Sequence, residues 1–276
     1  MDYRPKKRFG QNFLKSEHVV ERILAAADLD ETDRVLEIGP GLGALTDRIL
    51  PLINEMTVME VDRDLAARLS ARAPDKLTLH LGDALRLDWN ALLTAPPYKL
   101  VANLPYNISS QILFKVLDHR RLFRRLVLMF QKEVGDRLCA SPGTKDYGIL
   151  SVLCQVWFDV KRVVNVPPGA FSPPPKVDSV VLSFEPLPEP RVVVTDEALF
   201  RRVVKGAFAQ RRKTLRNTLK ASGFGDPNLE EILLAIDIDP VRRGETLSLE
   251  EFARLAEALG KNSTTAEQIP VTQNLS

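Results

Sequence analysis

The feature that most constrains the fold of this chain is a strand, a glycine turn and a helix in direct succession. Residues 34–39 form a short apolar run, residues 39–43 read Gly-Pro-Gly-Leu-Gly, and Leu45, Ile49 and Leu50 then follow at helical spacing. Units of this kind build open α/β sheets, and the glycine turn lets a ligand approach the backbone closely. We therefore expect a ligand to bind where the first strand ends.

The alternation of strand and helix patterns continues along the chain. Strands are predicted at residues 34–39, 56–61, 77–81, 99–102 and 126–130, with a returning pair at about 160–166 and 177–184. This order favours a Rossmann-like α/β domain with a mostly parallel, doubly wound sheet. Parallel strands bring their carboxyl ends to one edge. Glu60, Asp83 and Asn103, which follow the second, third and fourth strands, are therefore expected to lie together.

The tetrapeptide Asn103-Leu104-Pro105-Tyr106 offers the groups needed to methylate an exocyclic amine. The lone pair of adenine N6 is delocalised into the ring, and two acceptors on its N–H bonds would localise it toward a methyl donor. An Asn side-chain oxygen and a nearby backbone carbonyl are such acceptors. Pro105 fixes the local backbone, and Tyr106 offers a flat face to a base. Taken alone, the tetrapeptide fits an ordinary turn better, because Asn and Pro are common turn residues.

The glycine turn and the carboxylates after the next strands predict a pocket for S-adenosylmethionine (SAM). Glu60 lies 21 residues after Gly39, where a ribose diol needs a double acceptor. Asp83 is suited to accept from an adenine amino group. Together with the amine clamp at Asn103, these residues favour a SAM-dependent methyltransferase.

A nicotinamide-nucleotide oxidoreductase is the competing interpretation. Gly39, Gly41 and Ala44 also fit the pattern G-x-G-x-x-G/A, with an acidic residue about 20 positions further on. In that alternative Glu37 and Asn103 have no role, whereas SAM chemistry uses both. We therefore disfavour the oxidoreductase.

Seven motifs between residues 4 and 260 carry a resemblance to a known family. They are residues 7–14 (KRFGQNFL), 37–43 (EIGPGLG), 82–84 (GDA), 103–106 (NLPY), 145–148 (KDYG), 171–177 (FSPPPKV) and 210–217 (QRRKTLRN). In this order they resemble the bacterial small-subunit rRNA adenine dimethyltransferases, the KsgA family. The resemblance implies SAM as cofactor and dimethylation of N6 of two adjacent adenosines in the 3′-terminal hairpin of 16S rRNA. It also implies an immature 30S particle as substrate and a late role in small-subunit assembly.

The resemblance also implies roles for individual residues. It implies SAM contacts from Asn12, Leu14, Gly39, Glu60, Asp83 and Asn103. It implies that Asn103 and the backbone of Leu104 and Pro105 hold the amine. Tyr106 and Phe171 would sandwich the flipped adenine, because aromatic side chains commonly stack on an extruded base. From the residues alone, Phe171 fits a core aromatic beside a proline turn better.

The length of 276 residues predicts two domains, because single hydrophobic cores rarely grow beyond ~250–300 residues. Pro186, Pro188 and Pro190 mark a boundary, so residues 1–187 are the predicted catalytic domain. Residues 191–260 are the predicted all-helical domain, for which we expect an rRNA-binding role. The polar residues 261–276 are predicted to be a disordered tail.

Capping signals place several helix ends. Ser16 is expected to cap a helix that precedes the first strand. In the second domain, helices are predicted at about 196–221, 228–236 and 248–259. The last of these has a capping box of Ser248 and Glu251 and a terminal Gly260.

Basic side chains are concentrated in three clusters, although the net charge is only +2. Residues 198–225 hold eight Lys or Arg and no Asp or Glu. The other clusters are Arg4, Lys6, Lys7 and Arg8, and Arg120, Arg121, Arg124 and Arg125. Any one cluster fits a solvated helix face equally well, but such concentration is typical of phosphate binding. We expect the helical domain to contribute affinity and register on rRNA through Arg211, Arg212, Lys213 and Arg216.

The sequence disfavours secretion, membrane insertion and metal binding. No stretch approaches the ~20 apolar residues of a membrane span, and the basic N-terminus lacks the apolar region of a secretory signal. Cys139 and Cys154 show no metal-ligand spacing, so we predict no metal site. We expect a monomeric, cytoplasmic protein with reduced cysteines.

Two alternatives to the 16S enzyme remain open. A 23S rRNA adenine methyltransferase of the antibiotic-resistance kind shares the SAM and Asn-x-Pro-Tyr motifs, although residues 171–177 and 210–217 resemble the 16S enzymes better. A non-catalytic RNA-binding assembly factor on a methyltransferase fold is the second. Such a factor would have no physical need for the Asn103 clamp or the glycine turn.

Overall fold

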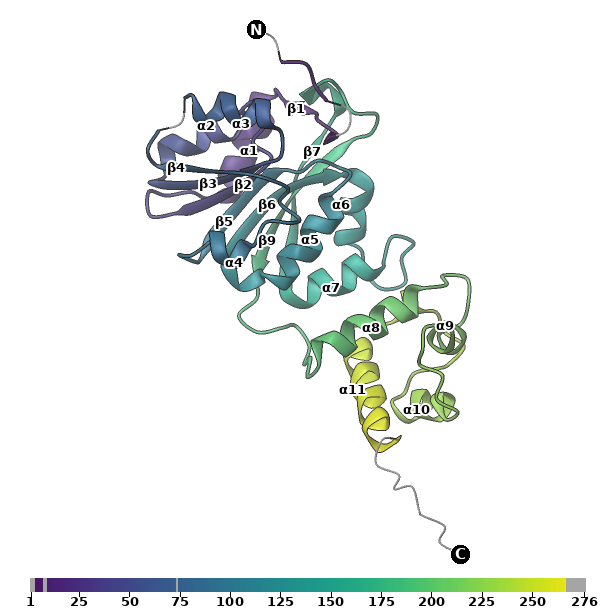
Figure 1. Ribbon diagram of the computed structural model, residues 1–276. Helices are drawn as coiled ribbons and strands as arrows, with labels where there is room; N and C mark the ends of the chain where they lie inside the picture. The colour runs from purple at the N-terminus through teal and green to yellow at the C-terminus, as the bar shows by residue number, and fades with distance from the viewer. Residues whose placement is uncertain (1–2, 7–8, 73, 267–276) are drawn as a thin grey trace, which may run out of the picture. The chain divides into compact units, whose positions relative to one another are not determined.

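The computed structural model describes residues 3–6, 9–72 and 74–266, and its contacts divide the chain into two compact units (Figure 1). The first unit comprises residues 1–139 and 158–187, and the second comprises residues 140–157 and 188–276. This division differs from the predicted domains in one segment, because residues 140–157 group with the helical unit. In the described part of the chain, no helix is both long and apolar enough to cross a membrane.

A seven-stranded sheet forms the centre of the first unit, as counted over its described residues. The strand order is β4 (Leu77–Leu81), β3 (Glu55–Glu60), β2 (Arg34–Ile38), β5 (Tyr98–Asn103), β6 (Phe123–Gln131), β9 (Ser179–Pro186) and β7 (Phe158–Val166). The neighbours from β4 to β6 are parallel, whereas β9 runs antiparallel to both β6 and β7. The predicted mostly parallel α/β sheet, including its returning pair of strands, is confirmed.

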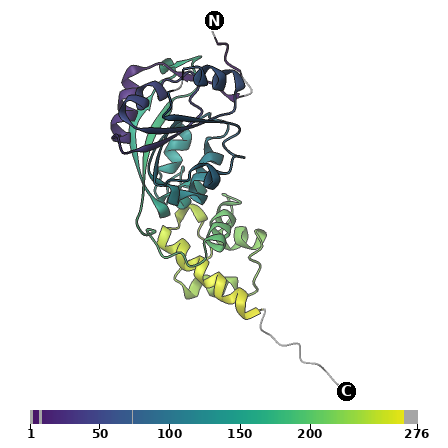
Figure 2. The same ribbon diagram turned by 60° about the vertical axis from the view of Figure 1, so that its left-hand side comes forward.

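Helices cover both faces of the sheet. They are α1 (Glu17–Ala27), α2 (Thr46–Ile49), α3 (Arg63–Ser70), α4 (Trp89–Leu92), α5 (Ser109–Asp118) and α6 (Lys132–Leu138), with short 3-10 turns at Leu50–Leu52, Arg120–Leu122 and Pro168–Ala170. As expected, the Ser16 side chain caps α1 by accepting from the Val19 amide. α1, drawn in purple, packs on β7 and its neighbours through an apolar stripe that includes Val20 and Ile23 (Figure 2).

A second, two-stranded sheet joins the N-terminal segment to the proline-rich loop. β1 (Phe13–Leu14) pairs antiparallel with β8 (Phe171–Ser172), so that Leu14 lies opposite Phe171. Both side chains belong to the buried apolar cluster on the α1 side of the main sheet. This pairing brings residues 9–14 beside the carboxyl edge of the parallel strands.

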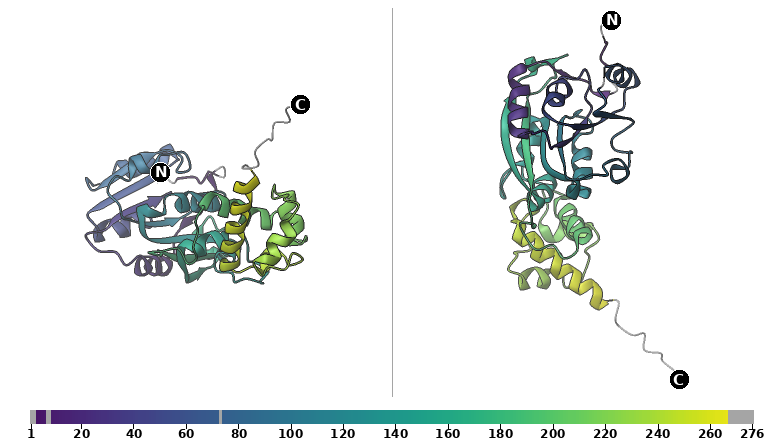
Figure 3. Two further views of the ribbon diagram at one scale, coloured as in Figure 1. Left: turned by 90° about the horizontal axis from the view of Figure 1, so that it is seen from below. Right: turned by 90° about the vertical axis from the view of Figure 1, so that its left-hand side faces the viewer.

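The second unit is helical in its described residues. It contains α7 (Ile149–Trp157), α8 (Glu197–Phe208), α9 (Leu215–Ala221), α10 (Leu229–Ala235), a 3-10 turn at Gly244–Thr246 and α11 (Leu249–Ala266). α8 contacts α7, α9 and α11, which is the long yellow helix in Figure 3. The predicted capping box is present, because Ser248 Oγ accepts from the Glu251 amide and Glu251 accepts from the Ser248 amide.

Two predicted helix boundaries in this unit are wrong. The expected helix at 196–221 is interrupted between α8 and α9, where Arg211 donates to the backbone carbonyl of Lys145 and the Gln210 amide donates to Thr218. These tertiary hydrogen bonds outweigh the helical propensity of the segment. α11 also continues past Gly260 to Ala266, so the tail predicted from residue 261 is helical at its start, and residues 267–276 lie outside the described residues.

A buried ion cluster lies at the amino ends of the parallel strands. Asp33 is 1% exposed, and its carboxylate lies 2.8 Å from the Lys99 ammonium. It also accepts from Arg124 and from the Asp30 amide. Burial lowers the pKa of Lys99, the nearby charge of Arg125 acts in the same direction, and Asp28 and Asp30 act against it.

We expect Asp33→Asn to lower the free energy of unfolding by about 3–5 kcal/mol, because Lys99 would stay buried without its counter-charge. Glu31→Gln, an exposed neighbour in the same loop, should change it by less than about 0.5 kcal/mol. Urea denaturation followed by circular dichroism measures both values. A loss below about 1 kcal/mol for Asp33→Asn would show that water or rearrangement satisfies Lys99.

Candidate active site

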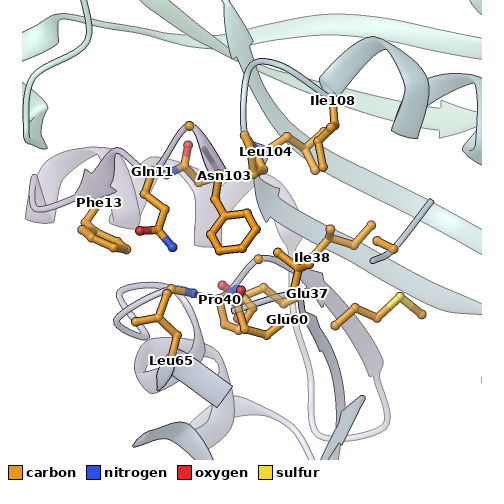
Figure 4. A pocket seen from close by; sticks show the side chains of 18 of the residues that line it. Gln11, Phe13, Glu37, Ile38, Pro40, Glu60, Leu65, Asn103, Leu104 and Ile108 are labelled. Carbon is orange, nitrogen blue, oxygen red and sulfur yellow. Dashed lines mark hydrogen bonds between the residues drawn. The ribbon is translucent and has the colours of Figure 1, made fainter. Parts of the chain in front are cut away.

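The carboxyl ends of the parallel strands surround an open cavity with about 900 Å³ of empty space, open solvent included. Its wall is built by residues from five parts of the first unit, namely residues 9–14, 37–42 with Ala44 and Leu45, 59–61 with Leu65, 82–84, and 103–106 with Ile108. Gln11 and Asn103 lie on one side of this cavity, and Glu37 and Glu60 lie on the other (Figure 4). The residues expected from sequence to contact a ligand therefore come together at one place, with the exception of Phe171.

The glycine turn after β2 has the conformation that its sequence requires. Gly39, Gly41 and Gly43 all have a positive φ, which residues other than glycine rarely adopt. A Cβ at Gly41 would also lie 3.0 Å from the Phe13 ring. The turn thus exposes bare backbone to the cavity and lets the N-terminal segment approach it.

Two buried carboxyl groups lie behind the turn. Glu60, which is 4% exposed, accepts from the Asp62 amide at 2.9 Å and from the Gly41 amide at 3.3 Å. Burial raises the pKa of Glu60, and these backbone hydrogen bonds act against the increase. Burial raises the pKa of Glu37 to about 8, although Thr46 donates to its carboxylate at 2.6 Å. A cationic ligand in the cavity would be stabilised when either group ionises.

An ionised aspartate fastens the N-terminal segment to the site. Asp62 accepts from Tyr3 Oη at 2.6 Å, from Lys6 Nζ at 2.7 Å and from Gln11 Nε2 at 3.2 Å. Burial raises the pKa of Asp62, but these hydrogen bonds and the one from the Asp64 amide outweigh burial, so that its pKa is lowered. This cluster holds residues 9–14 as a wall of the cavity, a role that no sequence motif indicated.

The Asn103 side chain is held with its oxygen available. Its Nδ2 donates to the backbone carbonyl of Asn12 at 3.1 Å, which leaves Oδ1 as an acceptor. The Pro105 carbonyl accepts from the Ile108 amide at 3.1 Å, whereas the Leu104 carbonyl accepts no hydrogen bond within the described chain. The Tyr106 hydroxyl bonds with the buried Ser179 Oγ at 2.5 Å, which fixes the ring beside this turn.

The structure places Phe171 away from the cavity. Its side chain is 1% exposed, lies in the core cluster with Leu14, and does not line the cavity. The expected sandwich of Tyr106 and Phe171 around a base is therefore not formed in this arrangement. The core interpretation describes Phe171 better, because its strand pairing with Leu14 directs it inward.

Asp83 lies at the opposite end of the cavity lining from the Asn103 turn along the sheet edge. Its Oδ1 accepts from the Leu85 amide at 2.9 Å, so the carboxylate is held within its own loop. Arg86 lies 3.7 Å from the other oxygen. The Asp83 side chain remains partly exposed, which leaves it able to accept from a ligand.

These features define a SAM-dependent methyltransferase. The residues present fit SAM, because the turn offers bare backbone, Glu60 and Asp83 offer acceptors, and the buried carboxyls favour a cationic group. The model of the family described as "Ribosomal RNA adenine dimethylase" matches residues 3–261. The chain belongs to this family, and it is an rRNA adenine dimethyltransferase that uses SAM.

Individual relatives agree with the family assignment. The "Ribosomal RNA small subunit methyltransferase A" of Syntrophotalea carbinolica is 70% identical over 94% of this chain and 98% of its own length. A crystal structure of a dimethyladenosine transferase from Plasmodium falciparum is 28% identical, with a TM-score of 0.76, covering 91% of this chain and 98% of that one. The 23S rRNA methyltransferase ErmE is 25% identical, with a TM-score of 0.64, covering 90% of this chain and 100% of that one.

We expect SAM binding near neutral pH to release a proton from Glu37. With a pKa of about 8 this group is mostly protonated in the free protein, and a cationic ligand favours its ionised form. Affinity for SAM should therefore increase as pH rises from about 6 to about 8 and then level off. Calorimetric titration in buffers of different ionisation enthalpy counts the released protons.

Glu37→Gln is the matched control and should remove this proton release. The free energy of unfolding should depend on pH in the opposite direction from SAM affinity. The Glu37 carboxyl has a pKa of 4.5 in the unfolded chain, whereas in the folded protein it stays protonated until about pH 8. Glu37 therefore lowers the free energy of unfolding as pH rises through that window. Equal proton release by the wild type and by Glu37→Gln would contradict the assignment.

Proposed function

We propose that this enzyme places two methyl groups on N6 of each of two adjacent adenosines in the 3′-terminal hairpin of 16S rRNA. Its substrate would be an immature 30S particle, and it would act late in small-subunit assembly, as a monomer in the cytoplasm. The observation that carries the chemistry is the Asn103 side chain, whose amide nitrogen is engaged by Asn12 so that its oxygen is left for a substrate amine. The 16S rRNA substrate is supported by the 70% identical relative, whose name refers to the small subunit.

The proposed catalysis consists mainly of positioning. SAM supplies the electrophilic methyl group when bound. Asn103 Oδ1 and the Leu104 carbonyl accept hydrogen bonds from the two N–H groups of the target amine. These hydrogen bonds turn the amine lone pair out of conjugation with the ring. The Tyr106 ring, fixed by Ser179, supports the base. No dedicated base is required, because the product aminium is acidic enough to lose its proton to water or to a carbonyl acceptor.

The proposed cofactor contacts are those implied by the family resemblance. They come from Asn12, Leu14, Gly39, Glu60, Asp83 and Asn103, all of which line the cavity. Leu14 is largely buried, so its contribution would be an apolar contact from the wall. For Phe171 we propose a supporting role through its pairing with Leu14.

We expect Asn103→Ala to abolish methyl transfer while SAM affinity stays within about tenfold of the wild type. The side-chain acceptor of the amine is lost, whereas only one hydrogen bond to the cofactor wall is removed. Single-turnover transfer to 30S particles and calorimetric SAM binding measure the two effects. Asn107→Ala, an exposed neighbour outside the cavity lining, is the control. Unchanged turnover in Asn103→Ala would refute the proposed clamp.

The basic clusters differ in how far they are engaged within the protein. At the amino ends of the strands, Arg124 pairs with Asp33, and Arg125 pairs with Asp28 and Glu185. Lys6 pairs with Asp62 and Asp64, while Lys7 and Arg8 lie outside the described residues. These two clusters therefore offer less free charge to RNA than their sequences indicate.

In the helical unit, two of the four basic residues expected to face rRNA are engaged. Arg211 donates to the carbonyl of Lys145 and lies 3.6 Å from Glu245. Arg216 pairs with Glu230 at 2.5 Å. Arg212 and Lys213 are exposed and form no ion pair within the described residues, so we propose that they contact rRNA phosphates.

We expect the double substitution Arg212→Ala and Lys213→Ala to weaken binding to 30S particles and to reduce the slope of log affinity against log salt by about 2. SAM affinity should stay unchanged. Arg216→Ala should change the slope less, because Glu230 already neutralises that charge. Filter binding over a series of salt concentrations measures the slopes. Identical slopes for wild type and double variant would count against an rRNA-facing role.

A further inference from the structure

The loop that carries Asp83 is held mainly through its own carbonyl groups. Within the loop, the amides of Arg86 and Leu87 donate to the Asp83 carbonyl at 2.8 and 3.0 Å, which forms a tight turn after β4. Trp89 Nε1 donates to the Ala84 carbonyl at 3.0 Å. Two further carbonyls, those of Leu85 and Leu87, are bound by one side chain from a different element.

That side chain is Lys115 of α5. Its Nζ donates to the Leu85 carbonyl at 3.0 Å and to the Leu87 carbonyl at 2.5 Å. The same ammonium lies 5.2 Å from the centre of the Trp89 ring, within the range of a cation–π contact. The ammonium therefore joins two loop carbonyls to the aromatic residue that holds a third.

Lys115 lies on the helix that follows the Asn103–Tyr106 turn. α5 begins at Ser109, three residues after Tyr106, and Ser109 Oγ donates to the Tyr106 carbonyl at 3.2 Å. Buried Ile112, Leu113 and Val116 fix the helix against the core. A rigid helix thus connects the amine clamp to the Asp83 loop.

Nearby carboxylates favour the charged form of Lys115, which donates to the loop carbonyls. Burial lowers the pKa of Lys115, while the nearby carboxylates of Asp83 and Asp88 act against this decrease. The ammonium is thus close to Asp83 yet hydrogen-bonded to the carbonyls behind it. It can fix the loop without competing for the carboxylate.

We propose that Lys115 is a positioning residue that holds the Asp83 loop in the conformation in which Asp83 binds the cofactor. This inference rests on the proposed role of Asp83 as a SAM contact. Preorganising a loop in its bound conformation increases affinity, because less conformational entropy is lost on binding. Without the ammonium, the loop would lose its hydrogen bonds to α5, and the Leu85 and Leu87 carbonyls would have to bond to water instead.

The test begins with the affinity of the full-length protein for SAM. Lys115→Met keeps the apolar stem and removes the ammonium, and we expect the Kd for SAM to rise about tenfold, which corresponds to about 1.4 kcal/mol. The rate of transfer at saturating SAM should stay within about twofold, because Asn103 is untouched. Lys115→Arg should recover most of the affinity, since guanidinium also donates to two acceptors. Gln111→Met, on the exposed face of the same helix, is the control.

A double-substitution cycle with Asp83→Ala separates positioning from a general loss of stability. If Lys115 acts through Asp83, Lys115→Met should have little further effect on SAM affinity in the Asp83→Ala background. If the fold-changes in Kd of the two single variants multiply in the double variant, Lys115 acts independently of Asp83 and the inference is overturned. It is also overturned if Lys115→Met binds SAM as tightly as the wild type while Asp83→Ala binds it weakly. Unchanged affinity in Asp83→Ala would instead remove the proposed cofactor role of Asp83. Should Lys115→Met fail to fold, Lys115→Leu, which also lacks a hydrogen-bond donor, replaces it in the cycle.

Discussion

The active site depends on the parallel pairing of β2, β3, β4 and β5, which brings four chain segments to one sheet edge. Registered pairs such as Ile38 with Met59 and Glu60 with Leu81 fix where each strand stops. A slip of one residue would exchange the two faces of a strand and move its last side chain out of the cavity. The chemistry of the site is therefore set by backbone pairing before any ligand binds.

The two edges of this sheet carry charge in different ways. At the amino edge, Asp33 and Lys99 are buried as a paired cluster that a ligand cannot reach. At the carboxyl edge, Glu37 and Glu60 are buried with hydroxyl and amide donors, and neither forms an ion pair with a described residue. Burial without a counter-charge raises their pKa values and leaves the cavity suited to a cationic cofactor. In the same region Asp62 is paired with Lys6 and serves to hold the N-terminal wall.

Local patterns in the sequence predicted what local physics controls. The glycine turn at residues 39–43 and the capping box at Ser248 depend on neighbours within a few positions. The features that sequence missed depend on partners far away in the chain. Examples are the burial of Phe171 by pairing with Leu14, the contact of Tyr3 with Asp62, and the break before α9 where Arg211 reaches Lys145. The sequence showed where basic residues cluster but not which of them are neutralised by distant carboxylates.

The proposed function requires that the cavity at the sheet edge presents SAM to an adenine N6 of the small ribosomal subunit. The most direct measurement is transfer of labelled methyl from SAM to 30S particles that lack the modification, with 50S particles in parallel, followed by nucleoside digestion. We expect dimethyladenosine from 30S particles alone. Label in 50S particles would contradict the proposed substrate. A protein that binds SAM but labels neither particle would contradict the proposed catalysis and favour an assembly role without methylation.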